Sequence, residues 1–150
     1  MTETALKEFA DKINQIMPVF VKEFTKTNAR VFFKEKLSFS QFLILQLLYS
    51  EGETKMTTLA KFMRVTTAAM TGIVDRLVRD HYLVRVDDPN DRRIIKVRLT
   101  PKAQGVVRKI NQERRKLVIS IFSKISDQDR KDYLRIVTHI KDILEAEAKI

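Results

Sequence analysis

The segment from Met56 to Leu99 constrains the fold most, because two short helical patterns are followed directly by two short strand patterns. Thr57 is expected to be the N-cap of the first helix. Arg64-Val65 then makes a turn, and Thr66 caps a second helix that runs to about Asp80. The side chains expected to face the core are Leu59, Ala60, Phe62 and Met63 in the first helix and Met70, Ile73, Val74 and Leu77 in the second.

The outer face of the second helix is unusual for a solvated helix, because its N-terminal part carries small or methyl-bearing side chains. This face consists of Ala68, Gly72, Asp75 and Arg79, flanked by Thr71 and Arg76. Small side chains let a helix approach base pairs closely, and threonine methyls and hydroxyls reach base edges or phosphates. The pattern favours a helix that enters the major groove of DNA, and an ordinary solvated helix is the alternative.

A hairpin is predicted after this helix, with strands at 82–87 and 94–99 and a turn-prone tip at 88–93. Between Arg64 and Lys109 there are eleven Lys and Arg residues against five Asp and Glu. The tip carries Arg92 and Arg93, which suit a neighbouring minor groove. In the alternative interpretation these arginines belong to a solvated turn and pair with Asp88 or Asp91.

The charge of the whole chain also favours a polyanionic partner. Its 150 residues include 29 Lys and Arg against 19 Asp and Glu, a formal net charge of +10. Such an excess binds nucleic acid through phosphate neutralisation, with an acidic membrane surface as the second candidate. The absence of cysteine excludes disulfides, thiolate zinc sites and cysteine redox sensing.

The remaining segments have patterns typical of helices. Because the chain has only three glycines and three prolines, it is expected to be mainly α with a small β-hairpin. An amphipathic pattern from Leu6 to Phe24 predicts a long helix that ends before about Arg30. Ser38 and Gln41 fit a capping box before an apolar helix that stops near Gly52. That apolar stretch is far too short to span a bilayer, so a soluble cytoplasmic protein without a membrane partner is expected.

Two more long helices are expected at the C-terminal end of the chain. Thr100-Pro101 pairs an N-cap with a proline at the first helical position, and Ser126 with Asp129 resembles a second capping box. The helices at both ends have more apolar surface than the small central unit can cover. Dimerisation through both ends accounts for this surplus, and a monomeric helical bundle is the alternative.

These motifs together resemble the MarR family of transcriptional regulators, over essentially the whole chain. The residues that carry the resemblance are Leu37-Ser38 with Gln41 and Leu45, Leu59-Ala60, Ala68-Ala69-Met70-Thr71-Gly72 with Val74-Asp75-Arg76-Leu77, Asp88-Pro89 with Asp91-Arg92-Arg93, and Leu99-Thr100. The resemblance implies a winged helix-turn-helix lobe at 36–100, with helical dimerisation regions at 1–30 and 101–150. It also implies a homodimer on a pseudopalindromic operator in double-stranded DNA, more often a repressor than an activator. The resemblance further implies that a small ligand, often an aromatic or phenolic anion, binds between the dimer-forming helices and the winged helix-turn-helix lobe and weakens DNA binding.

By position, the resemblance also implies which residues contact DNA. The start of the recognition helix matches at Thr66, Thr67, Ala68, Thr71 and Gly72, and Arg76 matches an arginine directed toward the backbone. In the hairpin, Arg93 matches the minor-groove arginine, Asp91 the acid that orients it, and Arg92 is an additional basic contact. Ser38 and Ser40 are candidate phosphate contacts at a helix start.

The sequence departs from the family pattern at three turns. Arg64, His81 and Ala103 stand where glycines are frequent in the family. His81 would need a left-handed backbone, which is uncommon for a residue other than glycine. These departures concern local turn geometry and leave the expected fold unchanged.

No pattern typical of an enzyme, a metal site or a cofactor site is found. The only histidines are His81 and His139, and no HExxH, GxSxG, P-loop or GxGxxG motif occurs. Asp87 and Asp88, at the end of the first predicted strand, could act as paired carboxylates, but adjacent side chains of a strand point to opposite faces, so a shared site is not expected. The remaining alternatives are a nucleic-acid or RNA-binding protein without sequence preference and a winged-helix interaction module.

Overall fold

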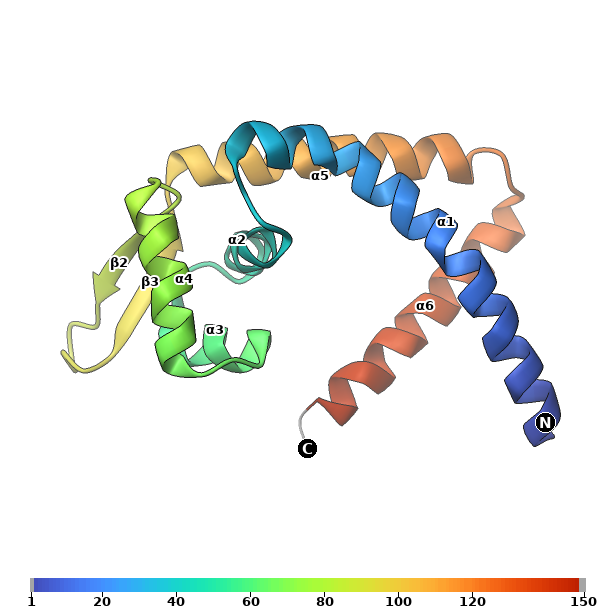
Figure 1. Ribbon diagram of the computed structural model, residues 1–150, viewed down its shortest axis with the longest axis horizontal. Helices are drawn as coiled ribbons and strands as arrows, with labels where there is room; N and C mark the ends of the chain where they lie inside the picture. The colour runs from blue at the N-terminus through green and yellow to red at the C-terminus, as the bar shows by residue number, and fades with distance from the viewer. Residues whose placement is uncertain (1, 149–150) are drawn as a thin grey trace. The chain divides into compact units, whose positions relative to one another are not determined.

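The computed structural model of the protein describes residues 2–148, which form six helices and three strands (Figure 1). The elements are α1 (Glu3–Glu35), α2 (Phe39–Glu51), β1 (Thr54–Lys55), α3 (Met56–Met63), α4 (Thr67–Arg79), β2 (Leu83–Asp87), β3 (Ile95–Leu99), α5 (Pro101–Phe122) and α6 (Asp127–Glu147). The chain forms two compact units, one up to Arg114 and one from Arg115 onward. The expected mainly helical fold with a small β-hairpin is confirmed.

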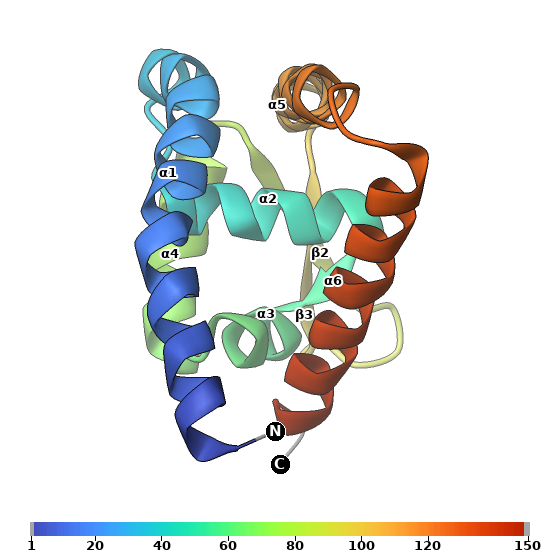
Figure 2. The ribbon, with the colours of Figure 1, turned by 90° about the vertical axis from the view of Figure 1, so that its right-hand side faces the viewer.

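Helix α1 is longer than predicted, because it runs to Glu35 and does not end before Arg30. Its last turns belong to the core: Val31 is buried, and the ring of Phe32 packs against that of Phe42 with centroids 5.1 Å apart. The helix ends where Lys36 adopts a left-handed conformation, with φ of 54°. The apolar spacing therefore continues past Arg30 because this end of α1 packs on α2, which runs across the direction of α1 (Figure 2).

Helix α2 is the central element of the core, as its apolar sequence predicted. The predicted capping box is confirmed: the Ser38 hydroxyl accepts from the Gln41 amide at 3.1 Å, and the Gln41 side chain accepts from the Ser38 amide at 2.9 Å. Gly52 closes the helix with φ of 78°, a conformation that glycine adopts without strain. The buried side chains of the core are Val31, Leu37, Phe42, Ile44, Leu45, Leu48, Met56, Leu59, Ala60, Met70, Val74, Leu77, Tyr82, Leu83, Val97, Leu99, Ala103, Val106, Val107 and Ile110.

The prediction that Thr57 is an N-cap is wrong. Helix α3 begins at Met56, with Lys55 as its N-cap and no side-chain hydrogen bond to the cap. The reason is that Lys55 pairs with β3 and the side chain of Met56 is buried, so the chain leaves the sheet directly into the helix. Phe62, expected to face the core, is instead exposed on the outer side of α3.

The second helix of the pair forms as predicted. The Thr66 hydroxyl accepts from the Ala69 amide at 3.1 Å and caps α4. Met70, Val74 and Leu77 have no exposed surface. Arg64 closes α3 in a left-handed conformation with φ of 53°, so the turn adopts the geometry that glycine usually supplies.

The predicted hairpin is part of a three-stranded antiparallel sheet in the order β1-β3-β2. Leu83 pairs with Leu99 and Asp87 with Ile95, so each strand starts one residue later than predicted. Thr54 pairs with Val97 and Lys55 with Lys96, which adds the two-residue strand β1. The hairpin is therefore attached to the start of α3 as well as to the end of α4.

The second unit contains the end of α5 and all of α6. The Ser126 hydroxyl caps α6 by accepting from the Asp129 amide at 3.0 Å, as predicted. Tyr133 packs against Phe122 with ring centroids 4.9 Å apart, and Arg130 Nη1 donates to the Phe122 carbonyl at 2.9 Å. None of the described residues of α6 is buried. Its exposed apolar side chains are Tyr133, Leu134, Ile136, Val137, Ile140, Ile143 and Leu144.

Candidate nucleic-acid interface

The N-terminal half of α4 presents a solvent-exposed face of small side chains. Thr66, Thr67, Ala68, Thr71 and Gly72 are all exposed, as the prediction for this helix requires. A Cβ added at Gly72 would meet no atom within 4 Å, so packing within the chain does not require glycine there. The Thr71 hydroxyl donates to the Thr67 carbonyl at 3.0 Å.

The tip of the hairpin is ordered by its own carboxylates. Asp88 Oδ1 accepts from the amides of Asn90 and Asp91 at 2.9 and 3.1 Å. These hydrogen bonds, the one from Asn90 foremost, lower the pKa of the Asp88 carboxyl group. Asp88 Oδ2 also lies 3.4 Å from Lys96 Nζ, which ties the tip to strand β3.

Arg93 is held by Asp91 at this tip, while its side chain remains 91% exposed. Asp91 Oδ1 accepts from the Arg93 amide at 2.9 Å and from Nε at 3.2 Å, and Oδ2 accepts from Nη2 at 3.3 Å. The side-chain hydrogen bond from Arg93 is the main cause that lowers the pKa of the Asp91 carboxyl group. The ion pair that one sequence interpretation expected therefore exists, and it fixes the direction of an exposed guanidinium.

A second ion pair joins the hairpin to α4. Arg85 Nη2 on β2 donates to Asp75 Oδ1 on the outer face of α4. The two paired residues are ten positions apart in the sequence. The pair therefore connects the hairpin to the outer face of α4.

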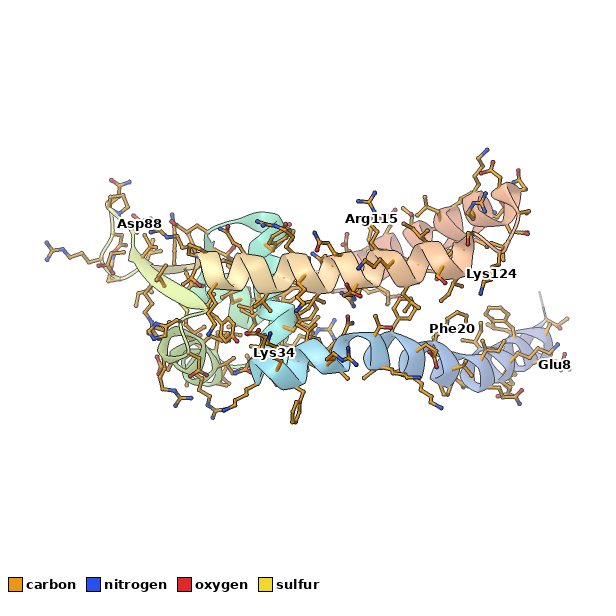
Figure 3. All side chains as sticks on the ribbon, turned by 90° about the horizontal axis from the view of Figure 1, so that it is seen from above. Glu8, Phe20, Lys34, Asp88, Arg115 and Lys124 are labelled. Atoms are coloured by element: carbon orange, nitrogen blue, oxygen red, sulfur yellow. The ribbon has the colours of Figure 1, made fainter. Side chains whose placement is uncertain are left out.

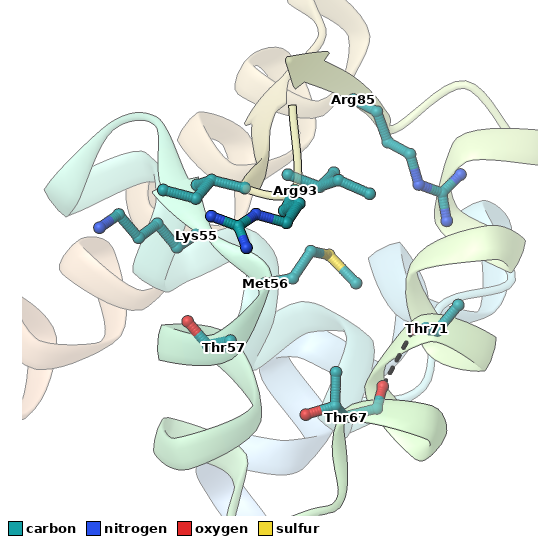
Figure 4. Close-up of a pocket in the computed structure, with 9 residues that line it drawn as sticks. Lys55, Met56, Thr57, Thr67, Thr71, Arg85 and Arg93 are labelled. Carbon is teal, nitrogen blue, oxygen red and sulfur yellow. Dashed lines mark hydrogen bonds between the residues drawn. The ribbon is translucent and has the colours of Figure 1, made fainter. Parts of the chain in front are cut away.

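A groove of about 320 Å³ lies between the hairpin and the helix pair (Figure 4). It is lined by Lys55, Met56, Thr57, Thr67, Thr71, Arg85, Arg93, Ile94 and Ile95. Three of the residues predicted to contact DNA, Thr67, Thr71 and Arg93, thus share one hollow. Sequence reasoning missed Lys55 and Thr57 as members of this surface, because their place depends on the short strand β1.

The other predicted contacts lie outside the lining of this groove. Arg76 and Arg92 are exposed, on α4 and at the hairpin tip respectively, and Asp91 is partly buried. Ser38 and Ser40 are exposed at the start of α2, where the Ser38 hydroxyl and amide are already engaged in the capping box. For these residues, contact with DNA stays a prediction.

The end of α1 is joined to the residues between α4 and β2. The Tyr82 hydroxyl lies within hydrogen-bond distance of both the Glu35 carbonyl and the Glu35 carboxylate. Lys102 Nζ lies 4.2 Å from the centroid of the Tyr82 ring and donates to the Asp80 carbonyl at 2.9 Å. His81 has φ of 63°, so it adopts the left-handed conformation that its place in the sequence required.

Two other kinds of site are absent from residues 2–148. Within this range no three His, Asp or Glu side chains are grouped so that they would hold a metal ion. Over the same residues, no helix combines the length and the apolar character needed to cross a membrane.

Known proteins resemble this chain in sequence. The profile of the MarR family matches residues 37–95, the stretch from the start of α2 to the start of β3. The uncharacterized HTH-type transcriptional regulator YsmB of Bacillus subtilis (strain 168) is 27% identical over 89 residues. These residues make up 59% of this chain and 61% of YsmB, so the match spans less than two thirds of that relative.

Solved structures resemble the chain over a greater length. The crystal structure of RV1404 from Mycobacterium tuberculosis is 25% identical, with a TM-score of 0.80, over 95% of this chain and 96% of the other. A MepR-like protein crystallised with pseudoligands is 30% identical, with a TM-score of 0.56, over 89% and 94% of the two chains. The elements from α2 to β3 are accordingly a winged helix-turn-helix, with the hairpin as its wing, and the chain belongs to the MarR family.

Proposed function

We propose that this protein is a transcriptional regulator that binds a pseudopalindromic operator in double-stranded DNA as a homodimer, with repression as the expected outcome. The observation that carries the proposal is the pairing of the small exposed face of α4 with the Arg93-bearing wing. A helix with small side chains fits a major groove, and an arginine on a projecting wing fits the neighbouring minor groove. This role requires access to the chromosome, so we expect a cytoplasmic protein.

The proposed dimer is supported by apolar side chains that remain exposed on α1 and α6. In the part of α1 up to Val21 these are Leu6, Phe9, Ile13, Ile16, Met17, Val19, Phe20 and Val21. Figure 3 shows the ring of Phe20 standing away from the α1 backbone. Apolar surface of this extent is typical of an interface with another chain. A second copy would set two recognition helices roughly 34 Å apart, about one turn of DNA.

A small aromatic or phenolic anion is the proposed relieving ligand, and one hollow suits its chemistry. An open surface depression of about 660 Å³ at the end of α1 is lined by Thr25, Ala29, Phe32, Phe33, Lys34, Lys36 and Leu37. Two phenylalanines offer apolar contact to a ring, and two lysines offer positive charge to an anionic group. Titration with a hydroxybenzoate tests this part, since binding that is unchanged in Lys36→Met would count against the site.

The function is tested by comparing two duplexes over a range of salt concentrations. The first is a sequence selected by the protein from a random library, and the second is a mixed-sequence duplex of equal length. A sequence-specific regulator is expected to bind the selected duplex at least about a thousandfold more tightly. Equal affinity for both duplexes would contradict sequence-specific regulation and favour a nucleic-acid-binding protein without sequence preference.

A further inference from the structure

We propose that Lys55, assisted by Thr57, binds a phosphate of the DNA backbone in the groove between the wing and α4. This inference rests on the proposed function, because it presupposes that the protein binds DNA. Neither Lys55 nor Thr57 is among the DNA contacts predicted from the sequence. The groove is lined by residues of β1, the start of α3, the N-terminal half of α4, strand β2, the tip of the wing and the start of β3.

The position of the groove indicates that it contacts the sugar-phosphate backbone of bound DNA and not the bases. When α4 enters a major groove and the wing enters the adjacent minor groove, the sugar-phosphate strand that separates these grooves lies between the two elements. The groove of about 320 Å³ occupies that space, with Thr67 and Thr71 on one side and Arg93 on another (Figure 4). A DNA strand passing there would bring its phosphates against Lys55 and Thr57 at the edge of the groove.

Lys55 has no ion-pair partner among residues 2–148, whereas the two arginines of the groove, Arg85 and Arg93, each have one. Arg85 is paired with Asp75, and Arg93 is paired with Asp91. Lys55 is exposed and has no ion pair or hydrogen bond from its side chain to any of residues 2–148. It can therefore bind a phosphate without losing an existing ion pair, whereas each arginine must share its guanidinium with a carboxylate.

The backbone of Lys55 is fixed on both sides, which favours a defined contact. Lys55 pairs with Lys96 in the sheet, and the next side chain, Met56, is 8% exposed and belongs to the core. The ammonium of Lys96 is directed to Asp88 at 3.4 Å, so an acid on the wing neutralises this neighbouring lysine. The hydroxyl of Thr57, one residue after Met56, is exposed at the same edge of the groove.

The test measures how the affinity of the full-length protein for DNA depends on salt. Each phosphate contact contributes about 0.9 to the slope of log K against log salt. Lys55→Met is expected to make this slope shallower by about 0.9 and to weaken the selected and mixed-sequence duplexes by the same factor. Lys55→Arg is expected to restore the slope. The matched control is Lys109→Met, which removes an exposed lysine of α5 that does not line the groove.

Ethylation interference on the selected duplex locates the contact. One phosphate per half-site, between the major-groove and minor-groove contacts, is expected to lose its interference in Lys55→Met and to keep it in Lys109→Met. An unchanged salt slope in a folded Lys55→Met protein would overturn the proposal, even where the wild type discriminates between duplexes. If the wild type fails to discriminate, the regulatory function fails instead, and the slope on the mixed-sequence duplex still tests Lys55.

Discussion

The Tyr82 hydroxyl oxygen lies 2.9 Å from the carbonyl oxygen of Glu35 and 2.8 Å from its Oε2, which joins the last turn of α1 to the residue before β2. One hydroxyl proton is shared between these acceptors, and the carbonyl is one that the helix itself leaves without an intrahelical partner. This contact connects a long helix with an exposed apolar face to the lobe that carries the wing.

Removal of this hydroxyl is expected to destabilise the protein. Tyr82 is only 3% exposed. Tyr82→Phe keeps the buried ring but loses the hydrogen bond to the Glu35 carboxylate. The free energy of unfolding is expected to fall by about 1–2 kcal/mol in denaturant titrations. Tyr133→Phe is the matched control, since Tyr133 is 50% exposed, and a similar loss in both variants would contradict the assigned role.

The same residue gives a prediction at alkaline pH. Burial, and then the hydrogen bond to Glu35, raise the pKa of the Tyr82 phenol above its usual value. The unfolded chain releases this proton near pH 10, whereas the folded protein retains it. The stability that this group contributes is therefore present below about pH 10 and lost as the pH rises further. The difference in unfolding free energy between wild type and Tyr82→Phe is expected to shrink above that pH; a constant difference would argue against the shift.

The Arg85–Asp75 ion pair is expected to matter more for DNA binding than for stability. Both side chains are partly exposed, so the pair stabilises the fold by only about 0.2–1 kcal/mol. Arg85→Gln leaves the Asp75 carboxylate uncompensated on the face that meets phosphate, and affinity for DNA should fall. Adding Asp75→Asn should recover part of that loss. Additive effects of the two changes, measured in the full double-mutant cycle, would show that the pair is not coupled to binding.

Substitutions at Arg93 and Thr71 are expected to impair DNA binding in two different ways, one by loss of affinity and the other by loss of sequence preference. Arg93→Ala is expected to weaken operator binding strongly, by about 1–3 kcal/mol, because an oriented guanidinium is removed from the minor groove. Thr71→Ala is expected to relax the sequence preference more than it lowers binding to a mixed-sequence duplex. Gel-shift titrations on both duplexes distinguish these outcomes. Operator binding left unchanged by both variants would show that the site is wrongly assigned.

The exposed apolar side of α6 predicts a self-associated protein. Ile140→Asp places a charge among the exposed apolar side chains of this helix, and the protein is expected to sediment with half the wild-type mass at micromolar concentration. His139→Asp changes the neighbouring, exposed position and is expected to leave the mass unchanged. A wild-type protein that sediments as a single chain would contradict the proposed dimer.

Most of the elements could be predicted from local patterns. The caps at Ser38, Thr66 and Ser126 mark helix starts by short-range hydrogen bonds, which the sequence displays directly. The buried side of α4 follows from the spacing of Met70, Val74 and Leu77, because one helical face must meet the core.

The features that sequence reasoning missed depend on contacts between distant segments. Strand β1 has two residues and exists because β3, some forty positions later, offers free backbone groups to Thr54 and Lys55. That pairing moves the start of α3 from the expected Thr57 cap to Met56 and sets Lys55 at the groove. The end of α1 was also misplaced, because Lys36 adopts a left-handed turn that glycine usually marks.

Helix α6, which buries none of its described residues within its own chain, has a consequence for how the proposed regulator responds to its own abundance. If two copies must assemble before either reads DNA, the amount of active protein at low abundance rises with the square of the number of chains. A twofold change in synthesis would then alter operator occupancy almost fourfold in the dilute range. The apolar helix would thereby make the control of target genes steeply sensitive to the expression level of the protein itself.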